Sequence, residues 1–272
     1  MPERNPEFIE AIARGIDVIT AFGSAPRALS LTEVATAADL ARPTARRILL
    51  TLADLGYVRV EDGAFSLTPR VLDLGLAYVS SSSIWELTRP HLVDLVNETN
   101  ESCSVAQLDG SDIVYVARVA VPKLVALSVS IGTRFPAAPT SLGKVLLEAV
   151  APSELDAVLA TASRSEVSST WRPDRSELDE VLRDVRARGW AATDQQLAPA
   201  IRSIAAPIRN SAGDVVAAVN INAHAFETSM ETLVDVHLPK LLRAAGEISA
   251  DWARWESLPA HRVSATVNGA DR

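Results

Sequence analysis

The chain has 272 residues, 48% of them hydrophobic and 22% charged, which favours two globular domains of ordinary size. The formal net charge of −8 excludes a uniformly basic coat for nucleic acid, so any contact with DNA requires a local basic patch. The single cysteine excludes an internal disulfide framework and a cysteine-based zinc site. Charges follow Met1 and no apolar run approaches about 18 residues, so we expect a cytoplasmic protein without a membrane segment.

Two helix start signals lie in the first forty residues. Asn5-Pro6 joins an N-cap residue to a proline at the first helical position, and apolar residues at helical spacing predict a helix over 6–22. Ser30 and Glu33 have the spacing of a capping box, which predicts a short helix over 31–38.

A third helix is predicted to open at Pro43, four residues later, and to run to Leu55. A short helix, a tight turn and a longer helix make a helix-turn-helix, whose second helix presents its N-terminal residues to DNA bases. The apolar residues of this third helix share one side: Ala45, Ile48, Leu49, Leu52 and Leu55. The residues expected to contact DNA are Arg42, Pro43, Thr44, Arg46 and Arg47.

An alternating hairpin follows the third helix. Residues 57–60 and 65–67 alternate on either side of Asp62-Gly63, a strong two-residue turn signal. Three helices and a hairpin predict a winged helix, in which Arg59 would contact a phosphate of DNA. Winged helices also serve as protein-interaction modules, so the fold alone leaves both functions open.

The rest of the chain predicts a second domain of the α+β class. We expect a DNA-binding domain over 1–68, a linker helix over 69–83, an effector domain over 84–258 and a flexible tail over 259–272. An antiparallel sheet flanked by helices is indicated. The expected strands are 103–108, 113–119, 125–129, 190–193, 203–208 and 214–222, and the expected helices are 84–97, 142–147, 152–161, 174–188 and 230–256.

No strong catalytic motif is present. The four histidines lack ligand spacing and Gly143-Lys144 is not part of a phosphate-binding loop, so we expect no catalytic residue, metal or cofactor. Cys103, in a predicted strand, fits a small buried residue. A hydrolase or amidase that uses Cys103 or a serine is the enzymatic alternative.

Polar residues within apolar strands are more informative. Asn220 and Asn222 lie two apart and therefore share one face of a strand. They indicate either a solvent-facing side or a ligand site, which Ser203 on the neighbouring strand would join. Arg134 and Arg202 are candidate partners for a ligand carboxylate.

Several longer stretches resemble the IclR family of bacterial regulators, from about residue 8 to 255. The stretches that carry the resemblance are 15–19, 42–49, 52–58, 132–136, 140–144, 203–208 and 215–221. Residues 113–119 with Gly132-Thr133-Arg134 most resemble the subgroup that controls aromatic-acid breakdown through the β-ketoadipate pathway (the PcaR, PcaU and PobR type).

This resemblance implies a GAF-like effector domain, a homodimer or dimer of dimers, and binding to palindromic double-stranded promoter DNA. It also implies an aromatic or dicarboxylic acid effector, such as protocatechuate, 4-hydroxybenzoate or β-ketoadipate. The family's effector positions fall on Ser141, Leu142, Gly143, Thr193, Asp194, Ile201, Ser203, Asn220 and Asn222. Several members have serines at the two asparagine positions and a cysteine at Ser203, which favours a different or larger acid here.

Overall fold

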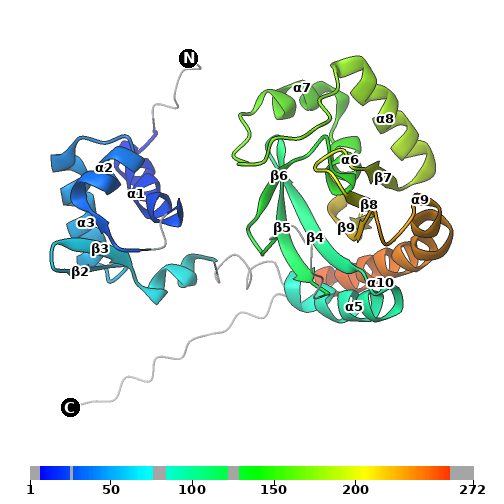
Figure 1. Cartoon of the computed structure of the whole chain (residues 1–272), viewed down its shortest axis with the longest axis horizontal. Helices are drawn as coiled ribbons and strands as arrows, with labels where there is room; N and C mark the ends of the chain where they lie inside the picture. Colours follow the sequence, from blue (N-terminus) through cyan, green and yellow to red (C-terminus); the bar gives the residue numbers. More distant parts are fainter. Residues whose placement is uncertain (1–6, 25–26, 76–83, 122–128, 258–272) are drawn as a thin grey trace, which may run out of the picture. The chain divides into compact units, whose positions relative to one another are not determined.

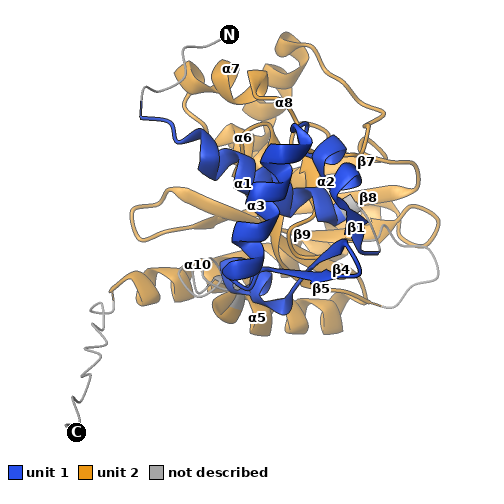
Figure 2. Ribbon diagram, turned by 90° about the vertical axis from the view of Figure 1, so that its left-hand side faces the viewer, with its two compact units in different colours: residues 1–82 blue, residues 83–272 orange. Residues whose placement is uncertain are grey.

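The computed structural model describes residues 7–24, 27–75, 84–121 and 129–257. The chain divides into two compact units, residues 1–82 and 83–272 (Figure 2), and each has its own hydrophobic core. The expected linker helix beyond Gly75, all but the last residue of the expected strand at 125–129, and the expected tail at 259–272 lie outside the described residues.

The first unit is a winged helix-turn-helix, as the sequence predicts. Its small sheet has the strand order β1-β3-β2 and packs against the three helices. The helices are α1 (Glu10–Ala21), α2 (Leu31–Ala37) and α3 (Arg42–Asp54), with short 3-10 turns at Phe22–Ser24 and Pro69–Val71; the strands are β1 (Leu29–Ser30), β2 (Val58–Glu61) and β3 (Ala64–Leu67).

Local signals explain most of these boundaries. Ser30 and Glu33 form the predicted capping box at the start of α2. Asp62 and Gly63 both have positive φ, 49° and 77°, in the tight turn between β2 and β3. The predicted cap at Asn5-Pro6 lies outside the described residues. The helix α1 begins later than predicted, at Glu10, because Ile9 is extended and its carbonyl accepts the first helical hydrogen bonds.

The core of this unit lies between the three helices and the wing. Ala45, Leu49 and Leu52 point into it from α3, but Leu55 is 51% exposed. Leu55 follows the last helical residue, and Gly56 then turns the chain with φ 80°, so the expected apolar side ends at Leu52.

The second unit contains a six-stranded antiparallel sheet with the order β6-β5-β4-β9-β8-β7. Its strands are β4 (Ser102–Asp109), β5 (Asp112–Val119), β6 (Arg134–Pro136), β7 (Ala191–Asp194), β8 (Ile201–Arg209) and β9 (Val215–His224). Its helical segments are α5 (Ile84–Thr99), α6 (Ser141–Glu148), α7 (Pro152–Ala160), α8 (Arg175–Arg188), α9 (Met230–Thr232), a π-helical segment (Leu233–His237) and α10 (Leu238–Ser257).

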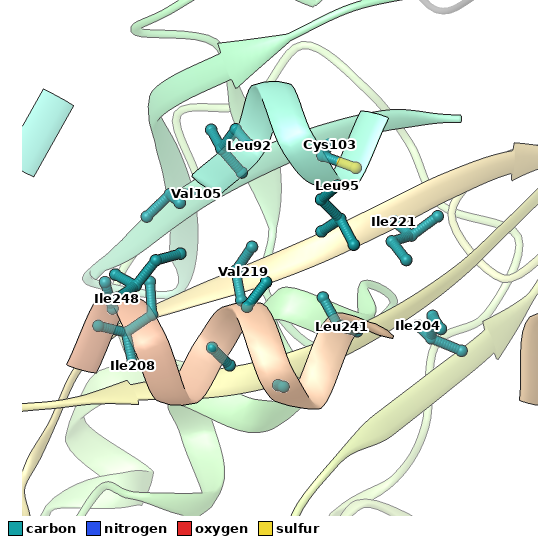
Figure 3. Packing of buried hydrophobic residues seen from close by; sticks show 14 of the residues in the cluster. Leu92, Leu95, Cys103, Val105, Ile204, Ile208, Val219, Ile221, Leu241 and Ile248 are labelled. Atoms are coloured by element: carbon teal, nitrogen blue, oxygen red, sulfur yellow. The ribbon is translucent and has the colours of Figure 1, made fainter. Parts of the chain in front are cut away.

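Helices cover both faces of this sheet. The helices α5 and α10 lie together against one face, and α6, α7 and α8 lie on the other (Figure 1). Side chains of α5 and α10, among them Leu92, Leu95 and Leu241, pack on alternate residues of the strands, including Ile204 and Ile221 (Figure 3). The remaining strand residues face α6.

Two elements of the second unit differ from the expectations. Residues 134–136, which are not among the expected strands, form the edge strand β6 beside β5. The single helix expected over 230–256 contains the π-helical segment Leu233–His237 immediately before Leu238 and Pro239. Proline has no amide hydrogen to donate to the preceding turn, so the helical hydrogen bonding has to change near it.

Candidate functional site

The outer surface of α3 carries three arginines that are free to bind a ligand. Arg42, Arg46 and Arg47 are exposed, and no ion pair engages them among the described residues. Other arginines of this unit are paired, such as Arg27, which lies 2.6 Å from Glu33. Pro43 is exposed and Thr44 half-buried at the N-terminal turn of the same helix. The surface offers several guanidinium groups to an anion.

Arg59, the expected phosphate contact in the wing, is not free in this structure. Its guanidinium lies 3.2 Å from the carboxylate of Glu61, and both side chains are more than half exposed. An exposed pair of this kind contributes about 0–1 kcal/mol. A phosphate could displace Glu61 at small cost, but Arg59 is a weaker candidate than the arginines of α3.

In the second unit, buried polar side chains gather on the face of the sheet toward α6. The Ser141 and Ser203 hydroxyls lie 2.7 Å apart. The Asn220 amide donates to Ser203 at 3.3 Å and accepts from the backbone N–H of Ser104 at 3.1 Å. All four side chains are at most 4% exposed. Polar groups buried together in an apolar layer are typical of a ligand site.

Three further expected residues lie on this face by strand alternation. Asn222 pairs with Ser203 in the sheet register, and Ser203 pairs with Thr193. Ile201 lies two residues before Ser203 on β8 and shares its side. The predicted common face of Asn220 and Asn222 is therefore present, and it faces protein rather than open solvent.

Other expected residues are not brought into this cluster. The carboxylate of Asp194 faces the opposite side of the sheet from Thr193 and holds the guanidinium of Arg202 at 2.8 Å. This hydrogen bond from Arg202 lowers the pKa of Asp194. Arg134 lies on the edge strand β6 and is paired with Asp109. Both arginines proposed for a ligand carboxylate already bind a carboxylate of the protein.

Leu142 and Gly143, also expected at the effector site, have packing roles in this structure. Leu142 is fully buried among apolar residues of α6, α7 and α8. Gly143 lies so close to the loop before α6 that a Cβ atom there would be 2.0 Å from the carbonyl oxygen of Ala137. The glycine lets α6 approach that loop.

Sequence reasoning missed Tyr115 and Arg118 of β5. Burial raises the pKa of the Tyr115 phenol, against the effects of Arg118 and of hydrogen bonds with Asn222 and Asn220. Arg118 donates a hydrogen bond of 3.0 Å to the Ser104 hydroxyl. The available signal was an arginine at the penultimate position of the otherwise apolar strand 113–119.

Cys103 lies on the opposite face of the sheet, in the core beneath α5 (Figure 3). Its side chain has no exposed surface, and burial raises the pKa of the thiol. A nucleophilic cysteine requires an accessible thiolate. The environment of Cys103 is therefore that of a small apolar core residue.

Lys144, on α6, is a second buried cation that sequence reasoning passed over. It is 2% exposed, donates to Gln196 and lies 4.6 Å from the ring centre of Trp171. Burial, with a contribution from Arg188, lowers the pKa of Lys144 to about 8. Lys144 thus links α6 to Gln196, which follows β7, but the burial of its charged ammonium group costs free energy.

This cost makes stability depend on pH. The unfolded chain binds the Lys144 proton up to about pH 10.5, whereas the folded chain releases it near pH 8, so stability rises with pH between these values. Relative to a Lys144→Met variant, the wild type should gain about 2–3 kcal/mol between pH 7.5 and 10.5 in urea unfolding. Lys240→Met, which removes a surface ammonium group bonded to the Glu98 carbonyl, is the control. An unchanged pH dependence in Lys144→Met would contradict the assignment.

Among the described residues, no helix is long and apolar enough to cross a membrane. The same part of the chain contains no group of three or more His, Cys, Asp or Glu side chains arranged to hold a metal ion.

A winged helix-turn-helix with free arginines on its second helix, followed by an α+β domain with a buried polar cluster, defines a DNA-binding regulator with a ligand domain. Two family models match the chain: the IclR helix-turn-helix domain over residues 11–62 and the bacterial transcriptional regulator IclR C-terminal domain over 76–250. The chain belongs to the IclR family of transcriptional regulators.

Relatives place it near regulators of aromatic-acid metabolism. It is 36% identical to the Pca regulon regulatory protein of Pseudomonas putida, over 90% of this chain and 84% of that protein. It is 30% identical to the p-hydroxybenzoate hydroxylase transcriptional activator of Acinetobacter baylyi, over 90% of this chain and 92% of that protein.

Two solved structures are also similar to this chain. A putative transcriptional regulator from Rhodococcus sp. RHA1 is 44% identical, with a TM-score of 0.79 over 91% of this chain and all of that one. The inducer-binding domain of PobR from Acinetobacter, a double mutant in complex with 3-hydroxybenzoic acid, is 25% identical. Its TM-score is 0.56 over 61% of this chain and 97% of that one.

Proposed function

We propose that this protein regulates genes of aromatic-acid catabolism, binding promoter DNA through α3 and a small organic acid in its second unit. The observation that carries the DNA-binding part is the set of exposed, unpaired arginines at positions 42, 46 and 47 on the outer side of a helix-turn-helix. Thr44, Arg46 and Arg47 would contact bases, and Arg42 and Arg59 would contact phosphates.

Two observations support an aromatic or dicarboxylic acid as the effector. The relatives described above include a Pca regulon regulator and an activator named for p-hydroxybenzoate hydroxylase, and the PobR domain was solved with 3-hydroxybenzoic acid. The buried cluster of Ser141, Ser203 and Asn220 supplies hydrogen-bonding groups suited to hydroxyl or carboxyl substituents. Thr193, Ile201 and Asn222 would complete the site.

We further propose the division of the chain into domains, its oligomeric state and its location in the cell. Residues 1–68 would act as the DNA-binding domain, 69–83 as a linker and 84–258 as the effector domain, with 259–272 as a tail. A homodimer or dimer of dimers would place two winged helices on successive half-sites of a palindromic promoter. As a regulator of promoter DNA, the protein would work in the cytoplasm.

The enzymatic alternative has little support, because Cys103 lies buried in the apolar core with a raised thiol pKa and the relatives are named as regulators. We therefore propose that the protein is not an enzyme. A winged helix that binds only protein is the second alternative, and it predicts no binding to DNA at low salt.

A DNA titration tests the proposal. The Arg47→Ala variant should bind the DNA upstream of its gene about 5–150-fold more weakly than the wild type, with relaxed sequence preference, because a base-reading arginine contributes about 1–3 kcal/mol. Gel shifts at two salt concentrations would measure this. Arg183→Ala, which removes an exposed arginine of α8, is the matched control. Equal binding by the wild type and an Arg46→Ala/Arg47→Ala double variant would exclude α3 as the recognition helix.

A further inference from the structure

Arg118 of β5 is a half-buried cation without an acidic partner. Within the described residues its guanidinium makes no ion pair with a carboxylate, and the ionisable side chains beside it, Tyr115 and Cys103, are buried and uncharged at neutral pH. The adjoining residues 122–128 contain no aspartate or glutamate. Other half-buried arginines of this sheet, Arg134 and Arg202, each hold a carboxylate. A charge withdrawn from water without a counter-charge is costly.

A β-bulge in β5 places Arg118 on the face toward α6. Opposite Val105 and Ala106 of β4, the paired residues of β5 are Ala117 and Tyr115, so Val116 is an extra residue. Val116 and Ala117 both pack in the core beneath α5 and α10, and the next residue returns to the other side. Tyr115 and Arg118, three residues apart, therefore share one face.

The register then joins Arg118 to the polar cluster. Arg118 pairs with Ser104 on β4, Ser104 pairs with Asn220 on β9, and all three residues face α6. The contact between the guanidinium and the Ser104 hydroxyl, 3.0 Å long, leaves most of the five N–H donors of Arg118 without a protein acceptor in the described residues. Tyr115 and Asn222 supply uncharged hydrogen-bonding groups beside this cation.

We propose that Arg118 binds the carboxylate of the effector, with Tyr115, Asn220 and Asn222 contacting the uncharged part of the ligand. The proposal rests on the function proposed above, in which this unit binds a small organic acid. A planar guanidinium accepts a carboxylate through two parallel hydrogen bonds, and an acid held there supplies the counter-charge that the fold lacks. The ligands selected are then carboxylates with a polar group at their other end, rather than their neutral amides.

Titration calorimetry with matched ligand pairs tests this. The acids are 4-hydroxybenzoate, 3-hydroxybenzoate, protocatechuate and adipate, each compared with its neutral primary amide, which for adipate is the diamide. The wild type should bind at least one acid more tightly than its amide. Arg118→Gln should weaken the binding of that acid by about 30-fold or more and change the affinity for the amide by no more than about threefold. The reason is that truncating one partner of a buried charge pair leaves the other charge without a counter-charge, which costs much binding free energy.

Two further variants complete the test. Arg209→Gln, at the exposed end of β8, should bind like the wild type. Arg134→Gln tests the other candidate arginine, on β6. If Arg134→Gln no longer binds the acid and Arg118→Gln still does, Arg134 holds the carboxylate and our assignment is overturned. Equal acid affinity in Arg118→Gln and wild type overturns the assignment but leaves the proposed effector class intact. Failure of the wild type to bind any of the acids at millimolar concentration overturns both.

Discussion

Replacing Gly143 by alanine is expected to destabilise the second unit by about 3 kcal/mol, at the upper end for an added methyl group. The new Cβ atom would lie 2.0 Å from the carbonyl oxygen of Ala137 and 2.4 Å from its carbon. Both atoms belong to the backbone, so no side-chain rotation relieves the clash. Either α6 or the loop before it has to move, and Ser141 at the start of α6 would leave its hydrogen bond with Ser203.

Gly246→Ala is the matched control for this variant. Gly246 also lies within a helix, α10, but a Cβ atom there would meet nothing within 4 Å. Alanine favours the helix by about 0.5–1 kcal/mol over glycine, so this variant should be slightly more stable than the wild type. Urea unfolding of the full chain measures both. If the two variants shift the free energy of unfolding in the same direction, the close approach of α6 to Ala137 does not explain the effect of Gly143→Ala.

The second large effect is expected from Leu49→Ala in the first unit. Leu49 has no exposed surface and packs among apolar residues of all three helices and the wing. Truncating a buried leucine costs about 2–5 kcal/mol through lost burial and the cavity left behind. A small domain has little more stability than this in total. The winged helix should therefore unfold locally and lose DNA binding, although Leu49 is not a proposed DNA contact.

Hydrogen exchange of the full chain would show whether this loss is confined to one unit. In Leu49→Ala, amides of α1, α2 and α3 should exchange faster, while amides of β8 and β9 keep their protection. Leu55→Ala removes the same atoms from the residue that follows α3, whose side chain is 51% exposed, and should cost less than about 1 kcal/mol. Equal exchange in the two variants would contradict the assigned core.

Local signals account for what the sequence predicted well. The capping box at Ser30, the Asp62-Gly63 turn and the glycine after α3 act within a few residues, so they determine the winged helix from short stretches of chain. Strand alternation likewise placed Asn220 and Asn222 on one face. The order of the sheet is different, because strand pairing joins residues distant in sequence, and a three-residue edge strand such as β6 carries almost no pattern of its own.

The candidate effector site was predictable only in part, for a related reason. Ser203 and the two asparagines stand out as polar residues in apolar strands. The partners of arginines, in contrast, depend on tertiary contacts: Arg134 and Arg202 are as conspicuous in the sequence as Arg118, yet each is paired with an aspartate. Only the folded chain distinguishes a guanidinium neutralised by the protein from one that is not.

The bulge at Val116 means that the two halves of β5 follow opposite parities: odd-numbered residues face α6 up to Tyr115, and an even-numbered one, Arg118, does so beyond it. Deletion of one residue between Tyr115 and Arg118 would place the guanidinium on the opposite face of the sheet, among the leucines beneath α5, without any change of another amino acid. Which side of the sheet is charged thus depends on a count of residues, and a relative with an identical arginine but no extra residue would have a different site.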